Sequence, residues 1–269
     1  MSDKLAYLIF LLHLASLCGF LLAVFYQRPR LAKLAMKIML AGLLTQAATF
    51  TLYHWEGISS ATFNAREFSL VLSMFIGTLF LVFQLFTKTR LLGVLVAPVV
   101  FSLSAVTVMA RDDSFAVIAS GGYIALHIAL TVVGEAFFIV AVLAGALFLI
   151  QENLIRKKRA VRFVRLLPPL DDLDRINHIS FISGFPLLTA GIVIGAFMVY
   201  LGGNTSLLYD IKGLWTALAW VFYAGILFLR VVLGWRGRKV ALLSLGALLL
   251  LLFLFLASMN SPHSWHRLI

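Results

Sequence analysis

The stretch "GGYIALHIALTVVGEAFFIV", residues 121–140, is apolar at almost every position, yet it carries His127 and Glu135. A helix that crosses the hydrocarbon core of a bilayer needs about 20 such residues, because only a helix or a closed barrel satisfies its backbone hydrogen bonds in lipid. The stretch therefore predicts a membrane-spanning helix with two ionisable side chains inside it.

The rest of the chain has the same character. Hydrophobic residues make up 62% of it, charged residues 12%, and the mean hydropathy is +1.03, well above the range of a water-soluble domain. We expect an all-α fold, a polytopic transmembrane helix bundle that forms a single domain over residues 1–269. It should have about eight spans, at 5–26, 34–53, 68–87, 91–109, 119–150, 178–201, 213–234 and 241–258. The charged stretch 152–177 predicts a loop with an interfacial helix.

The basic residues fall mainly in alternate loops. Of the 22 Lys and Arg residues, 17 lie in the segments around 28–37, 88–90, 156–175 and 230–239. Cytoplasmic loops carry an excess of Lys and Arg, so these segments should face inward and both termini outward. This distribution explains the net charge of +11, and we expect no nucleic acid partner.

Several function classes lack their sequence features. Cys18 is the only cysteine, which excludes an internal disulfide or a CxxC pair. We find no phosphate-binding loop, no H-E-x-x-H, no G-x-S-x-G and no pair of broken spans typical of inverted-repeat transporters.

Four of the six histidines fall at or near the predicted outer face: His54, His127, His263 and His266. Neutral imidazole is a good ligand for iron, copper or zinc. A haem needs only two axial ligands and an apolar or aromatic wall, which suits this chain better than a zinc site. His127 has an equally open alternative, a hydrogen bond across a helix interface. We expect packing or interface roles for His13 and His178.

The predicted outward loop "LGGNTSLLYDIKGLWTALAW", residues 201–220, contains rare outward charges beside aromatic residues. Asp210 has the form of an N-cap for the next helix, which composition alone favours. Alternatively, Tyr209, Trp215 and Trp220 could form a platform for a planar ligand, with Lys212 near an anionic group.

Two further features of the spans predict structure. Glu135 lies about 80° around the helix from His127, and we expect it to be a buried packing or proton-handling group. Gly184, Gly191 and Gly195 predict close helix contacts, and Pro186 predicts a local kink.

Several stretches together resemble the cytochrome c assembly family of CcsA-like and HemX-like membrane proteins. They are "LHIALTVVGEAFFIVAVLAGALFLIQE" (126–152), "LDRINHISFISGFPLLTAGIVIGAFM" (173–198), "YDIKGLWTALAWVFYAGILFLRVVLGWRGRK" (209–239) and "HSW" (263–265), and the loop "YHWEGISSATFNAREFSLVLSMF" (53–75) is similar as well. The resemblance covers most of the second half of the chain.

The resemblance implies a haem platform with two flanking axial histidines, which match His127 and His263. The family's Trp-Asp-Pro-Lys run matches Asp210 and Lys212, and the following aromatic matches Trp215. Tyr209 stands where the family has Trp, Ile211 where it has Pro, and Phe228 where full synthetases carry a histidine. These departures favour the shorter HemX-like branch.

The resemblance thus implies a haem-handling protein of cytochrome c biogenesis in a bacterial-type inner (plasma) membrane. Haem, b-type and non-covalent, would be bound by His127 and His263, with Asp210, Lys212, Trp215 and Tyr209 beside it; His266 is the alternative to His263. Expected partners are haem, the bilayer, and an assembly partner or apocytochrome c. The chain is expected to be no enzyme by itself, but a component of a haem-attachment complex.

Two other functions remain open. The chain could be a HemX-like regulatory or scaffold protein of haem biosynthesis without its own haem site, acting through residues 152–177. It could also be a small-molecule or proton transporter that uses Glu135.

Overall fold

The computed structural model describes residues 3–54, 61–63, 65–87, 90–109, 117–119, 122–157, 168–201 and 211–259. These residues form eight α-helices: α1 (Asp3–Phe25), α2 (Pro29–His54), α3 (Ala65–Phe86), α4 (Gly93–Met109), α5 (Gly122–Arg156), α7 (Leu170–Leu201), α8 (Ile211–Val231) and α9 (Arg238–Met259). A short 3₁₀ turn, η1 (Arg90–Leu92), precedes α4. The predicted helix bundle is confirmed, and each expected span overlaps one helix.

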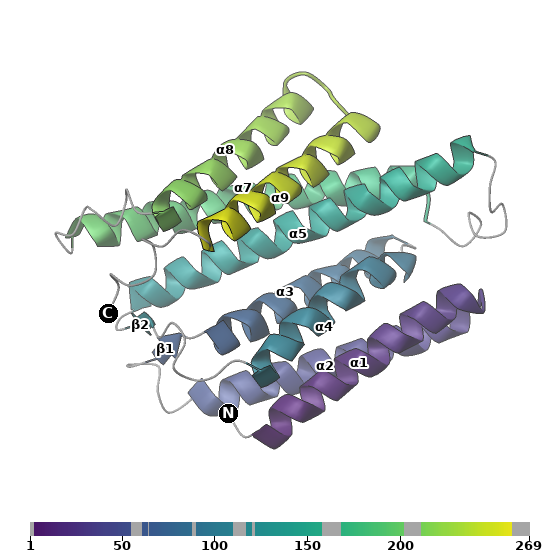
Figure 1. Cartoon of the computed structure of the whole chain (residues 1–269), viewed down its shortest axis with the longest axis horizontal. Coiled ribbons are helices and arrows are strands. Elements are labelled where there is room, and N and C mark those ends of the chain that lie inside the picture. Colours follow the sequence, from purple (N-terminus) through teal and green to yellow (C-terminus); the bar gives the residue numbers. More distant parts are fainter. Residues whose placement is uncertain are drawn as a thin grey trace.

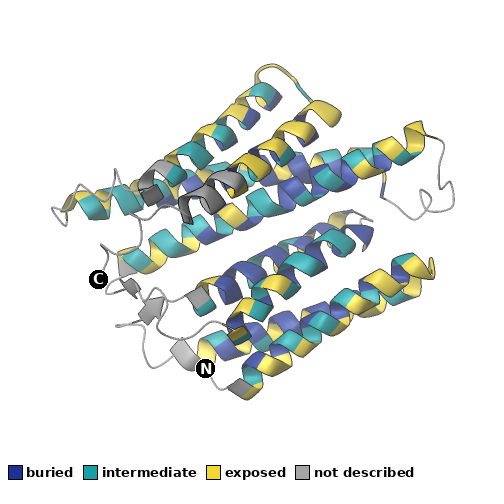
Figure 2. Cartoon of the chain, in the orientation of Figure 1, coloured by how far each residue is buried: buried dark blue, intermediate teal, exposed yellow. Residues whose placement is uncertain are grey.

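Length and composition fit a membrane. Five helices have described stretches long and apolar enough to cross a bilayer: α1, α2, α3, α5 and α7. Their outward faces carry large apolar side chains, among them Leu11, Phe25, Leu44 and Phe86, which are at least half exposed. Figure 2 shows such exposed positions along the outer sides of the bundle. In water a surface of this kind would be costly, so the medium around it is lipid.

The long helix α5 is the centre of the arrangement. Figure 1 shows α1–α4 on one side of α5 and α7–α9 on the other, and α5 packs on α3, α7 and α9. One buried cluster joins α1–α4 to α5, and a second joins α5 to α7–α9 around Phe181, Tyr223 and Val240.

Small residues bring α5 and α7 close together. A Cβ on Gly134 would lie 2.9 Å from the backbone nitrogen of Leu188, and one on Gly191 would lie 3.0 Å from that of Thr131. A Cβ on Gly184 would lie 2.7 Å from the Cβ of Phe137. The predicted close contacts of α7 are therefore confirmed. Pro186 lies inside α7, which continues through it.

The charged stretch 152–177 is helical at both of its ends. Helix α5 continues to Arg156, and α7 begins at Leu170, with Asp171 and Asp172 in its first turn. The prediction of a loop was therefore wrong for these residues. Acidic side chains in a first helical turn interact favourably with the helix dipole, so the helix extends beyond its apolar part.

Successive helices run in alternate directions between the two ends of the bundle (Figure 1). The last residues of α1, α3, α5 and α8 and the first residues of α2, α4, α7 and α9 lie at one end, which holds Arg28, Arg156 and Arg236 and which we call the basic end. At the opposite end, β1 (Ala61–Phe63) pairs antiparallel with β2 (Val117–Ala119), with Thr62 opposite Ile118. This ladder links the segment before α3 to the segment before α5.

Candidate functional site

His127 lies in the second turn of α5, at the end of the bundle opposite the basic end, and its ring packs against α7. Its Nδ1 is 2.7 Å from the backbone oxygen of Gly191. A Cβ on Gly195 would lie 2.6 Å from the ring Cε1. The ring therefore occupies the space that Gly195 of α7 leaves open.

The hydrogen bond to Gly191 fixes the tautomer of His127. A carbonyl oxygen can only accept a hydrogen bond, so Nδ1 must donate, and in the neutral ring Nε2 then carries a lone pair. Metal-binding histidines typically donate their other ring nitrogen in this way, which orients the ring and raises its basicity. The sequence left two alternatives for His127, a hydrogen bond between helices or a metal-ligand role. Because the hydrogen bond uses only Nδ1, the geometry allows both at once.

Of the other predicted haem-site side chains, the structure describes Trp215, which is half-buried in the first turns of α8. Lys212 lies in α8, but its side chain is outside the described residues, as are Tyr209, Asp210, His263 and His266 entirely. Helix α8 begins at Ile211, one residue after Asp210. Trp220, on the same helix, donates from Nε1 to the Thr189 hydroxyl of α7 at 2.9 Å.

The remaining ionisable residues of the spans have other environments. His13 is 1% exposed, and its Nε2 would lie 2.9 Å from a Cβ on Gly42, as expected for a packing residue. Glu135 has an exposed position on the side of α5. It lies between Gly134, which contacts α7, and Ala136, which faces the core around α3.

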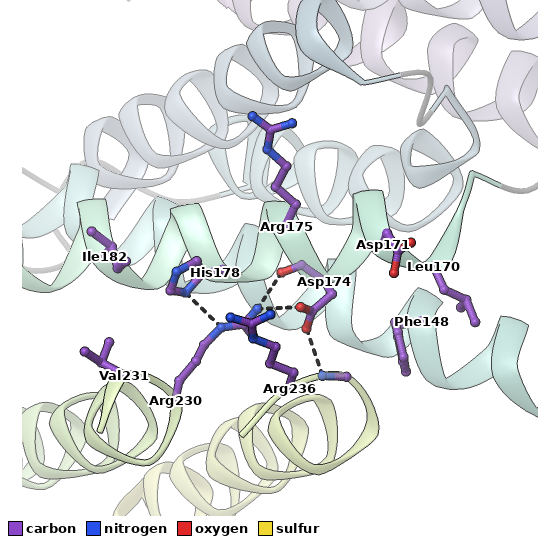
Figure 3. Close-up of a pocket in the computed structure, with 11 residues that line it drawn as sticks. Phe148, Leu170, Asp171, Asp174, Arg175, His178, Ile182, Arg230, Val231 and Arg236 are labelled. Atoms are coloured by element: carbon purple, nitrogen blue, oxygen red, sulfur yellow. Dashed lines mark hydrogen bonds and ion pairs between the residues drawn. The ribbon is translucent and has the colours of Figure 1, made fainter. Parts of the chain in front are cut away.

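The basic end contains a polar network that the sequence analysis missed. Arg230, near the end of α8, donates from Nε to His178 Nδ1, from Nη1 to Asn177 Oδ1, and from Nη2 to Asp174 Oδ2, each at 2.8 Å. Figure 3 shows the contacts of His178 and Asp174 converging on the Arg230 guanidinium. The Arg230 side chain is 4% exposed, so these bonds replace the water that it has lost.

The network joins α5, α7 and α8 and the turn before α9. Asp174 also accepts from the backbone nitrogen of Gly237 at 2.9 Å, which ties α7 to the turn before α9. Asn177 donates to the backbone oxygen of Ala141 in α5 at 2.8 Å. Gly237 has a φ of 61°, a left-handed conformation that favours glycine. Arg230 therefore fixes α8 and the α8–α9 turn against α5 and α7.

His178 has the opposite tautomer to His127. The Nε–H of Arg230 can only donate, so Nδ1 of His178 must accept, and the neutral ring carries its hydrogen on Nε2. In this arrangement His178 offers a hydrogen-bond donor and no lone pair for a metal.

Beside this network lies a cavity of about 870 Å³. Its polar lining includes Asp171, Asp174, Arg175, Arg230 and Arg236, and its apolar lining includes Phe148, Leu170, Ile182 and Val231. One sequence signal pointed here: Arg230 lies inside the predicted span 213–234, and a charge within a span usually has a partner.

Comparison with known proteins identifies the family. The family model described as "Cytochrome C assembly protein" matches residues 1–266. The cytochrome c biogenesis protein CcsA of Prochlorococcus marinus strain AS9601 is 37% identical over 86 residues, 32% of this chain and 28% of that protein. CcsA of Gloeothece citriformis is 38% identical over 74 residues, 28% of this chain and 23% of that protein.

An uncharacterized 28.8 kDa protein of Azospirillum brasilense is 29% identical over 163 residues, 60% of each chain. The match to each of the two CcsA proteins named above covers less than a third of that protein's length. No solved structure matches the chain. The family model, in contrast, spans nearly all of the sequence, and the resemblance seen in residues 126–152, 173–198 and 209–239 is confirmed. The chain belongs to the cytochrome c assembly protein family.

Proposed function

We infer that this protein handles haem in cytochrome c biogenesis and binds it at the end of the bundle opposite the basic end. The observation that carries the proposal is the orientation of His127. Its Nδ1 donates to Gly191, so its Nε2 is left with a lone pair that suits haem iron.

The second axial ligand in this proposal is His263, with His266 as the alternative. Tyr209, Asp210, Lys212 and Trp215 would border the porphyrin, with Lys212 near a propionate. Bound without a covalent link, as a b-type haem, the group would supply the iron and porphyrin chemistry. The protein's own side chains would hold and orient it, so no catalytic residue is assigned.

The positive-inside rule gives the orientation. The basic end would face the cytoplasm, and His127 would lie near the outer face of a bacterial-type inner membrane. There the chain would present haem to an assembly partner or to apocytochrome c. Family membership and the names of the CcsA relatives support this role.

The test is an absorption spectrum of the detergent-purified protein, oxidised and reduced, from cells supplied with a haem precursor. We expect a Soret band with low-spin bis-histidine features. His127→Asn is the informative variant, because the asparagine amide can still donate to Gly191 while it removes the ligand nitrogen. The band should be lost in His127→Asn and weakened in His263→Ala, while the variant proteins remain folded.

A second outcome would change the assignment. Protein that stays free of haem even after haem is added would contradict the proposal. It would favour a regulatory or scaffold function, tested by exchanging residues 158–167 and measuring haem synthesis in cells.

A further inference from the structure

The basic-end cavity has more positive than negative charge. Arg230 is neutralised by Asp174, whereas Arg175 and Arg236 have no hydrogen-bond or ion-pair partner in the described part of the chain. Asp171 also lines the cavity, so three arginines face two aspartates. Figure 3 shows Arg236 beside the Arg230–Asp174 pair, while Arg175 extends from α7 in another direction. The cavity therefore offers a site for a negatively charged group.

His178 adds an uncharged donor to this site. Because Nδ1 accepts from Arg230, the ring presents Nε2–H from a residue that lines the cavity. Guanidinium groups and an N–H donor match the oxygens of a phosphate.

The other part of the lining is apolar. Phe148, Ile182 and Val231 belong to it, and Ile182 and Val231 are 45% and 59% exposed on the outer side of their helices. A free phosphate would gain nothing from such a surface. An acyl chain attached to the phosphate would cover it.

The cavity also lies at the level expected for lipid head groups. Next to it in the chain, the Lys239 ammonium is 5.1 Å from the ring centre of Trp235, and Arg238 pairs with Glu152 at 3.2 Å. Trp and Lys residues at the end of an apolar span are typical of a membrane interface. Basic pockets between helices on the cytoplasmic side are known to suit anionic head groups.

From these observations we propose that the basic-end cavity binds the phosphate head group of an anionic membrane phospholipid, with Arg236 and His178 as its donors, Arg175 adding positive charge to the lining, and its apolar wall against an acyl chain. This site is separate from the proposed haem site and does not depend on it.

The experiment measures the melting temperature of the full-length protein in neutral detergent with added phosphatidylglycerol, phosphatidylcholine or inorganic phosphate. The test variant is Arg175→Gln/Arg236→Gln. The matched control is Arg28→Gln/Arg30→Gln, which removes the same charge from exposed positions at the same end. Both pairs of side chains are exposed, so both variants should fold. Native mass spectrometry counts the lipids that remain bound.

We expect phosphatidylglycerol to raise the melting temperature of the wild type and of the control equally, and the test variant to lose at least half of this shift together with one retained lipid. Equal shifts in all three proteins would overturn the proposal, since they would indicate diffuse surface attraction. A shift reproduced by inorganic phosphate alone would overturn the assignment to a lipid.

Discussion

The two ends of the bundle use the same residue type in opposite ways. His127 donates through Nδ1 to a backbone oxygen of α7, whereas His178 accepts through Nδ1 from the guanidinium of Arg230. The first ring is left with a lone pair and the second with an N–H. The hydrogen-bond partner of Nδ1 thus decides whether Nε2 of the same ring can bind a metal or donate to an anion. Four predictions test how the two ends of the bundle differ.

The largest effect is expected at Arg230. Arg230→Leu removes the buried charge that pairs with half-buried Asp174 and leaves Asn177 and His178 without their donor, so the free energy of unfolding should fall by about 3 kcal/mol. Denaturant unfolding in detergent measures the change. Adding Asp174→Asn should recover part of the loss, and a second loss of equal size would contradict the pairing.

The second prediction tests whether His178 stabilises the protein as a hydrogen-bond acceptor or only by filling space. His178→Leu leaves the Arg230 Nε–H unsatisfied and should cost about 1–3 kcal/mol. His178→Asn keeps an acceptor near the position of Nδ1 and should cost clearly less. The same unfolding measurement applies, and equal costs would show that the hydrogen bond has no part in the effect. Neither variant should change the haem spectrum.

The third prediction concerns the space beside His127. Gly195→Ala places a methyl group 2.6 Å from Cε1 of His127. The imidazole ring must therefore move, which disturbs its hydrogen bond to the Gly191 oxygen. We expect a loss of about 1 kcal/mol, at the low end for overpacking because the ring can move, together with a weaker Soret band. Gly246→Ala on α9 is the matched control, since nothing lies within 4 Å of the added carbon. A control that loses haem equally would contradict this explanation.

The smallest effect is expected on the exposed side of the basic end. Glu152 pairs with Arg156 at 2.8 Å and with Arg238 at 3.2 Å, and both arginines are more than half exposed. Glu152→Gln should therefore cost less than about 1 kcal/mol. If Glu152→Gln lowered the free energy of unfolding as much as Arg230→Leu, the ion pairs of Glu152 and the Arg230–Asp174 pair would have to be energetically coupled.

Much of the fold could be predicted from the sequence because a membrane imposes one length scale on every span. Each apolar window overlaps a helix, and the glycines of α7 mark its close contact with α5. The start of α7 was missed because Asp171, Asp172 and Arg175 lower the local hydropathy without ending the helix. The charged residues at the start of α7 can form a helix although they do not favour the hydrocarbon core, so a hydropathy window alone does not find where this helix begins.

The candidate sites were predictable to a smaller degree. His127 stood out as an ionisable residue in an apolar stretch, but its tautomer depends on a carbonyl 64 positions away. The Arg230–Asp174 pair joins residues 56 positions apart, and only the relative rotation of two helices brings them together.

The short ladder between β1 and β2 has a consequence for biosynthesis. Its two strands flank α3 and α4 in the chain, so β1 is made well before its partner exists. The pairing can form only after α3, α4 and β2 have been made. Like other contacts between distant parts of a chain, it forms late. The ladder thus ties the segment before α3 to the segment before α5 only after the two intervening helices have been made.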